Sequence, residues 1–137
     1  MKNTNILVLD TTFVLPLFGI EVLLTPTFQE EIKELWTNGI NGYKVYVPST
    51  CLIETNFKLL SEYRKREDFG ILDRYQLILP TVLNSPFKIF NPELNPKASL
   101  IAAKIRHSGH TDFMDCWIAA SAMVLNGVLL SEERNLN

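Results

Sequence analysis

The chain has 137 residues, 47% hydrophobic and 20% charged, which is typical of one globular domain and excludes a disordered or fibrous protein. A balance of 13 basic against 15 acidic residues excludes a positive field over the whole surface, so any contact with RNA must be local. Both cysteines, Cys51 and Cys116, lie in apolar stretches, and neither an export signal nor a membrane-spanning run is present, so we expect a reduced, cytoplasmic protein without a membrane segment.

The first third of the chain predicts strands and helices in alternation. Residues 5–10 (NILVLD) form a short apolar run that predicts a buried strand ending at Asp10. Residues 27–30 match a capping box, which opens a helix that an Asn-Gly pair ends. Residues 43–47 (YKVYV) predict a second strand, and a helix that carries Glu54 in its second turn follows it.

The middle of the chain predicts a helical hairpin. The helix that carries Glu54 runs into the charged stretch 61–68, and beyond Gly70 a second helix is expected to end near Pro80. Residues 87–90 (FKIF) then predict a short strand.

The last third predicts two consecutive helices and a strand. Asn95 caps a helix, and residues 112–126 form a nearly apolar helix that Gly127 ends, before a buried strand at residues 128–130. This alternation predicts an α/β domain over residues 1–137, with a central parallel sheet of four to five short strands and helices on both faces. In such sheets, sites form beyond the carboxyl ends of the strands.

Four acidic residues stand where this fold places a site. Asp10 follows the first strand, Glu54 and Asp115 lie on early helical turns, and Glu133 follows the last strand. Because the helix around Asp115 is apolar on all sides, we expect its carboxylate to enter the interior and to need a cation. Carboxylates without clustered His or Cys select Mg²⁺ or Mn²⁺, and these ions assist the hydrolysis of phosphodiesters.

Each acidic residue also has a structural interpretation that the sequence leaves open. Asp115 could belong to a capping arrangement that begins at Asp112, and Asp10 could make the turn after its strand. Glu54 could lie on a solvated helix flank, and Glu133 could belong to a solvated charge pair at the surface.

Basic side chains that could contact RNA lie on the predicted hairpin: Lys58, Arg64, Lys65, Arg66 and Arg74. A second basic group surrounds the helix before Asp112: Lys97, Lys104, Arg106, His107 and His110. Acidic residues are interleaved with the first group, so an ordinary solvated helix face is the alternative interpretation.

Four short motifs resemble those of the PIN-domain ribonucleases, a family that includes the VapC-type toxins of toxin–antitoxin pairs. They are residues 8–12 (VLDTT), 47–54 (VPSTCLIE), 112–122 (DFMDCWIAASA) and 129–136 (LLSEERNL). The resemblance implies a single PIN-like domain and an endoribonuclease that depends on Mg or Mn. It further implies four metal-binding and catalytic acids with hydroxyls that brace them: Asp10, Glu54, Asp115 and Glu133, with Thr11, Thr12 and Ser131.

Two departures from the family pattern keep a second interpretation open. Glu133 stands where the family usually has an aspartate, Asn135 where it often has another acid, and the family usually adds one more short strand beyond residue 137. The alternative is a catalytically weak or inactive PIN-like module that binds RNA or docks a partner. A phosphohydrolase with Asp10 as nucleophile is disfavoured, because Thr12 stands where a second acid would be needed.

Assembly is expected on general grounds. The many apolar residues of the predicted helices, together with a sheet edge that the last strand would leave uncovered, predict a homodimer or a complex with a small antitoxin-like protein.

Overall fold

Four strands form one parallel sheet in the computed structural model, which describes residues 5–20, 26–109 and 112–131. They are β1 (Asn5–Leu9), β2 (Tyr43–Pro48), β3 (Lys88–Phe90) and β4 (Val128–Leu130), in the spatial order β3-β2-β1-β4. The central strand is β1, where Leu7 pairs with Val45 of β2 on one side and with Val128 of β4 on the other. The predicted α/β class with a short parallel sheet is confirmed.

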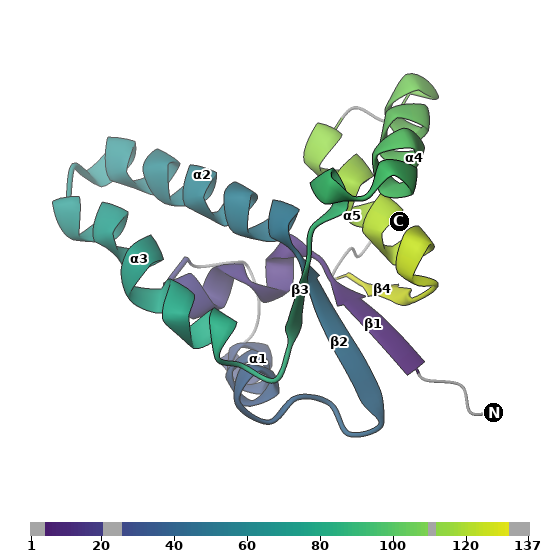
Figure 1. The fold of residues 1–137 in the computed structure, drawn as a ribbon. Helices are drawn as coiled ribbons and strands as arrows, with labels where there is room; N and C mark the ends of the chain where they lie inside the picture. Colours follow the sequence, from purple (N-terminus) through teal and green to yellow (C-terminus); the bar gives the residue numbers. More distant parts are fainter. Residues whose placement is uncertain (1–4, 21–25, 110–111, 132–137) are drawn as a thin grey trace.

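Five α-helices flank the sheet in the described part of the chain. Figure 1 shows α2 and α3 as a hairpin that extends to one side of the sheet, and α4 and α5 as a second pair on the other side. None of the described helices is long and apolar enough to cross a membrane. The helices are α1 (Pro26–Asn38), α2 (Ser49–Arg66), α3 (Phe69–Leu83), α4 (Pro96–His107) and α5 (Phe113–Leu125), with 3-10 helices η1 (Thr11–Phe13), η2 (Leu15–Phe18) and η3 (Pro92–Leu94).

Two hydrophobic clusters hold these elements together. The larger one joins the sheet to η1, η2 and helices α1 to α3, and Ile118 is the residue that α5 contributes to it. The smaller one lies between α4 and α5 and consists of three alanines and Cys116, all fully buried. Because these side chains are small, the two helices approach closely and form a separate packing unit beside the sheet.

The predicted start of α1 and the predicted end of α3 differ from the structure, whereas the predicted start of α4 is confirmed. Helix α1 begins at Pro26, before the predicted capping box. Helix α3 continues through Pro80 to Leu83, because the fully buried Val82 anchors its last turn and the backbone N–H of Asn84 donates to the Pro80 carbonyl. The Asn95 cap is confirmed, since its side chain accepts from the backbone N–H of Ala98 at 2.9 Å.

The end of α5 lies one residue before the predicted stop. Asn126 adopts the left-handed conformation with φ 58°, and its N–H bonds back to the helix. Gly127 has a different reason to be glycine, because a Cβ atom there would lie 2.7 Å from the Ile6 side chain on β1. The glycine therefore lets β4 start directly beside β1.

A candidate active site at the carboxyl ends of the strands

Asp10 lies where the central strand ends and the first 3-10 helix begins. Its backbone N–H donates to the Leu130 carbonyl at 3.2 Å, which ties the end of β1 to the end of β4. Its side-chain oxygen Oδ1 accepts from the backbone N–H of Thr12 at 3.0 Å and thereby caps η1. The structural interpretation of Asp10 as a turn-forming residue therefore holds, and the same turn fixes its carboxylate at the sheet edge.

Glu54 is joined to this turn by a hydrogen bond between side chains. The Thr11 hydroxyl donates to Glu54 Oε1 at 2.5 Å, and Thr11 is only 7% exposed. Glu54 is half-buried, so it does not lie on a fully solvated flank of α2. Thr11 thus links a residue of the β1 end to an acid on a helix that begins after β2.

Asp115 is exposed, so the prediction that its carboxylate enters the interior is wrong. The helix cap is Asp112, whose Oδ1 accepts from the backbone N–H groups of Met114 at 3.0 Å and Asp115 at 3.3 Å. The physical reason for the error is that α5 is apolar on all sides without being covered on all sides. Phe113 and Met123 are both more than half exposed.

One hollow of about 170 Å³ brings these residues together. It is lined by Asp10, Thr11, Thr12, Leu15, Glu54, Lys58 and Asp115. Of the predicted acids, only Glu133 is missing from this group, because it lies outside the described residues. Ser131 is described and exposed but does not line the hollow, and neither do Arg64, Lys65 and Arg66.

The three carboxylates of the hollow influence the pKa of the buried Cys51 thiol. Burial raises its pKa far above the ordinary value; a hydrogen bond with Thr11 works against this, and the charges of Asp10, Glu54 and Asp115 raise it further. Its Sγ lies 3.5 Å from the Leu9 carbonyl. The thiol therefore stays protonated and is no nucleophile.

The side chains that line the hollow are of the chemical type that binds hard divalent cations. Three carboxylates share the hollow with one lysine, so the lining carries a net negative charge, and its carboxylate and hydroxyl groups offer oxygen ligands. Within the described residues, however, no three His, Cys, Asp or Glu side chains form a closed metal site. Glu54 is turned toward Thr11, so closing a ligand shell around an ion requires this carboxylate to rotate or further ligands to join.

An apolar pocket of about 220 Å³ lies beside the acidic hollow and was missed by the sequence analysis. It is lined by Thr50, Ile53, Glu93, Phe113, Met114 and Trp117. Two of these, Ile53 and Met114, directly precede the acids Glu54 and Asp115. Phe113 is the first residue of α5, so its side chain has no preceding helical turn to pack against, and this position is the signal in the sequence that could have indicated its exposure.

The fold and the hollow together define a small α/β protein whose acidic residues gather where the parallel strands end. The sequence profile of the PIN domain family matches residues 7–137, and the chain belongs to this family. A comparison with curated proteins gives no match.

Two solved structures share the fold. One is the crystal structure of VapBC2 from Rickettsia felis bound to a DNA fragment from their promoter, with 16% identity, a TM-score of 0.60, and 93% of this chain and 88% of that chain covered. The other is a toxin–antitoxin complex from Klebsiella pneumoniae, with 16% identity, a TM-score of 0.56, and 92% and 85% covered.

Proposed function

We propose that the protein is a metal-dependent endoribonuclease that hydrolyses phosphodiester bonds of RNA. The observation that carries this proposal is the single hollow in which Asp10, Glu54 and Asp115 meet beside Lys58, in a chain of the PIN domain family. Carboxylates gathered at the carboxyl ends of parallel strands suit a reaction that handles phosphate charge through a cation.

The polar residues of the hollow, together with Glu133, each have a role in this proposal. Asp10, Glu54, Asp115 and Glu133 would hold Mg²⁺ or Mn²⁺, which when bound polarises a phosphodiester oxygen and makes water a better nucleophile. Thr11 orients the Glu54 carboxylate, and the backbone N–H of Thr12 fixes Asp10. Lys58 supplies a positive charge for a phosphate oxygen, and a carboxylate that faces the attacking water accepts its proton.

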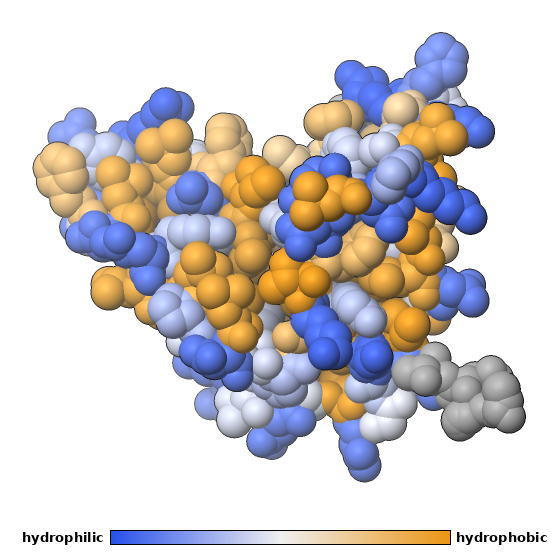
Figure 2. Space-filling model, in the orientation of Figure 1, coloured by the Kyte–Doolittle hydropathy of each residue, from blue (hydrophilic) through white to orange (hydrophobic). Residues whose placement is uncertain are grey.

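The chain is also proposed to be the toxin of a toxin–antitoxin pair. The two solved structures described above contain toxin–antitoxin proteins and share its fold. Figure 2 shows apolar side chains exposed over the α2–α3 hairpin, where Phe57, Phe69 and Leu77 are each more than 60% exposed. A small antitoxin-like protein or a second copy of the chain would cover such a surface. Light scattering tests for the second copy, and co-purification with the product of a neighbouring gene tests for the antitoxin-like protein.

The cleavage test uses purified protein, labelled single-stranded RNA and either Mn²⁺ or a chelator. We expect cleavage with the ion, none in chelator, and at least ~100-fold slower cleavage by Asp10→Asn and Asp115→Asn, because each removes a negative ligand. Asp112→Asn is the matched control, since Asn keeps the capping acceptor and Asp112 lies outside the hollow.

Two results would contradict the proposal. One is cleavage that survives chelation, and the other is wild-type activity in both Asp10→Asn and Asp115→Asn. Tight RNA binding without any cleavage by the wild-type protein would favour the alternative of an inactive RNA-binding module.

A further inference from the structure

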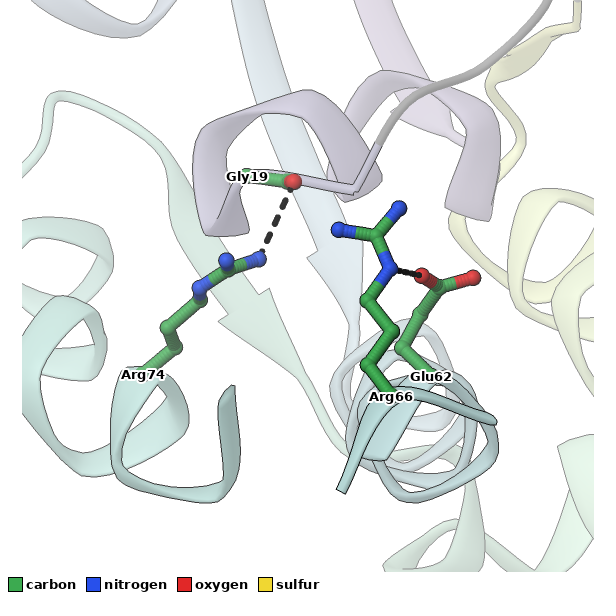
Figure 3. A network of polar contacts seen from close by, with 4 residues as sticks. All are labelled: Gly19, Glu62, Arg66 and Arg74. Atoms are coloured by element: carbon green, nitrogen blue, oxygen red, sulfur yellow. Dashed lines mark hydrogen bonds and ion pairs between the residues drawn. The ribbon is translucent and has the colours of Figure 1, made fainter. Parts of the chain in front are cut away.

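A second hollow, of about 260 Å³, lies between η2, α2 and α3. It is lined by Gly19, Glu62, Arg66 and Arg74. Figure 3 shows the two guanidinium groups reaching toward the same space from different helices, Arg66 from α2 and Arg74 from α3, below the Gly19 carbonyl. Two cations share this hollow with one acid, so its net charge is positive.

Each guanidinium is held by one contact that leaves other donors available. Arg74 Nη1 donates to the Gly19 carbonyl at 3.1 Å, and Arg66 Nε lies 3.5 Å from Glu62 Oε1. Among the described residues these are the polar contacts of the two groups, so both Nη atoms of Arg66 remain for a ligand. Gly19 makes room for Arg74, because a Cβ atom there would lie 3.1 Å from Arg74 Nη1.

Fold stability does not explain why these cations gather here. The Arg66 side chain is 65% exposed, and an exposed pair such as Arg66–Glu62 contributes little to stability. Glu62 compensates only one of the two guanidinium charges in this hollow, so a further anion would reduce their repulsion. Their planar forks match the oxygens of a phosphate better than a lysine would.

The second hollow and the acidic hollow both lie where α2 meets the segment 15–19. Glu54, Lys58, Glu62 and Arg66 follow one another at intervals of four residues, so they form a row of neighbouring side chains that winds by roughly 120° around the helix. The segment from Leu15 to Gly19 also runs from one hollow to the other, because Leu15 lines the first hollow and Gly19 lines the second. Twelve residues separate Glu54 from Arg66, which corresponds to roughly 18 Å along the helix.

We propose that Arg66 and Arg74 form a binding site for a backbone phosphate of the RNA substrate, several nucleotides away from the phosphodiester at the acidic hollow. This inference rests on the proposed function and adds a second anchor to it. Lys58 lines the acidic hollow about two helical turns before Arg66 on α2, so each of the two hollows offers a positive charge to the same RNA strand. The ligand is the sugar–phosphate backbone, so the site supplies affinity and register without reading the base sequence.

Binding in chelator tests the site without any cleavage. The probe is a fluorescein-labelled single-stranded RNA of about ten nucleotides, titrated at several salt concentrations. We expect Arg66→Gln and Arg74→Gln each to weaken binding roughly tenfold and to lower the slope of log K against log salt by about 0.7. Arg74→Lys should keep the slope and lose affinity, because it keeps the charge without the fork. Melting curves establish that each variant is folded.

Two further variants distinguish a defined site from diffuse charge. Lys33→Gln removes one charge from an exposed position on α1, and its slope should equal that of the wild type. Arg64→Gln removes an arginine from α2 that lines neither hollow. If Arg64→Gln lowers the slope as much as Arg66→Gln does, the helix binds RNA by diffuse charge and the proposed site is wrong.

Substrate length separates this inference from the proposed function. A dinucleotide is too short to span the two hollows, so with Mn²⁺ we expect Arg66→Gln and the wild type to cleave it equally. At low substrate concentration, we expect the variant to cleave the longer RNA roughly tenfold less efficiently than the wild type does. Equal loss on both substrates, or no loss on either, overturns the phosphate site and leaves the nuclease proposal intact. If the wild-type protein cleaves neither substrate but Arg66→Gln and Arg74→Gln still weaken RNA binding, the nuclease proposal is refuted and the phosphate site stands.

Discussion

The hydrogen bond from Thr11 to Glu54 gives the sharpest test of how the acidic hollow is held together. Thr11→Val keeps the shape of the side chain and removes the hydroxyl that donates to Glu54 Oε1 at 2.5 Å. Thr11 is buried and Glu54 half-buried, so after the substitution the carboxylate can still reach water. We therefore expect a loss of about 1–2 kcal/mol of unfolding free energy, the low end for a bond to a charged group.

A double-mutant cycle isolates the bond from other effects of the substitution. Thr11→Val, Glu54→Met and the double variant are unfolded with urea in chelator, and the coupling energy should be about 1 kcal/mol. Thr12→Val is the matched control, because Thr12 contributes its backbone N–H to Asp10 and keeps it in the variant. Its midpoint should stay close to that of the wild type.

A defined set of results would refute this reasoning. If the effects of Thr11→Val and Glu54→Met add without coupling, the bond does not stabilise the folded chain. If Thr12→Val costs as much as Thr11→Val, any substitution in this turn is destabilising, and the Thr11 hydroxyl has no special part.

Three further predictions concern the backbone and the buried thiol. Glu67→Gly should stabilise the protein by about 1 kcal/mol, seen as a higher urea midpoint, because Glu67 ends α2 at φ 52°. Gly127→Ala should destabilise it by about 1–3 kcal/mol, because the new methyl group meets Ile6; an unchanged melting temperature would contradict this. Burial above all raises the pKa of Cys51, so above the ordinary value of 9.0 the unfolded chain releases a proton that the folded chain keeps, and stability falls as pH rises. When the pH is raised from below to above 9.0, the unfolding free energy of Cys51→Ala should fall by less than that of the wild type. Equal falls would show that the Cys51 thiol does not cause the loss of stability.

The alternation of strands and helices could be predicted from the sequence because its signals are local. The β1 strand shows as an apolar run that stops at Asp10, and the cap at Asn95 shows as an Asn-Pro pair. Such patterns depend on neighbours within a few residues, which the sequence displays directly.

Features that depend on distant contacts could not be predicted in the same way. The apolar sequence around Asp115 does not tell which side of α5 is covered, and that depends on where α2 and α4 pack. The 3-10 helices after Asp10 arise from its side-chain cap and from the burial of Leu15 and Phe18. The Arg74 contact with Gly19 joins two helical segments far apart in the sequence.

For the candidate site, the sequence indicated which residue types would gather, and the structure adds how they are held. Asp10, Glu54 and Asp115 were expected together from their places after strands and on early helical turns, and they do line one hollow. The family resemblance implied that the Thr11 hydroxyl braces an acid, but its bond to Glu54 in particular depends on the register between β1 and β2, which spacing alone does not give.

The central place of β1 also determines when the hollow can form during synthesis. This strand is translated before the other described elements, yet one of its two neighbours, β4, is the last of them in chain order. Until β4 has been translated, the Asp10 N–H has no Leu130 carbonyl to bond, and Asp115 reaches the hollow only after α1 to α4 have been translated. The acidic hollow is therefore complete only when the two ends of the described chain have come together, so the elements translated last determine when its residues meet.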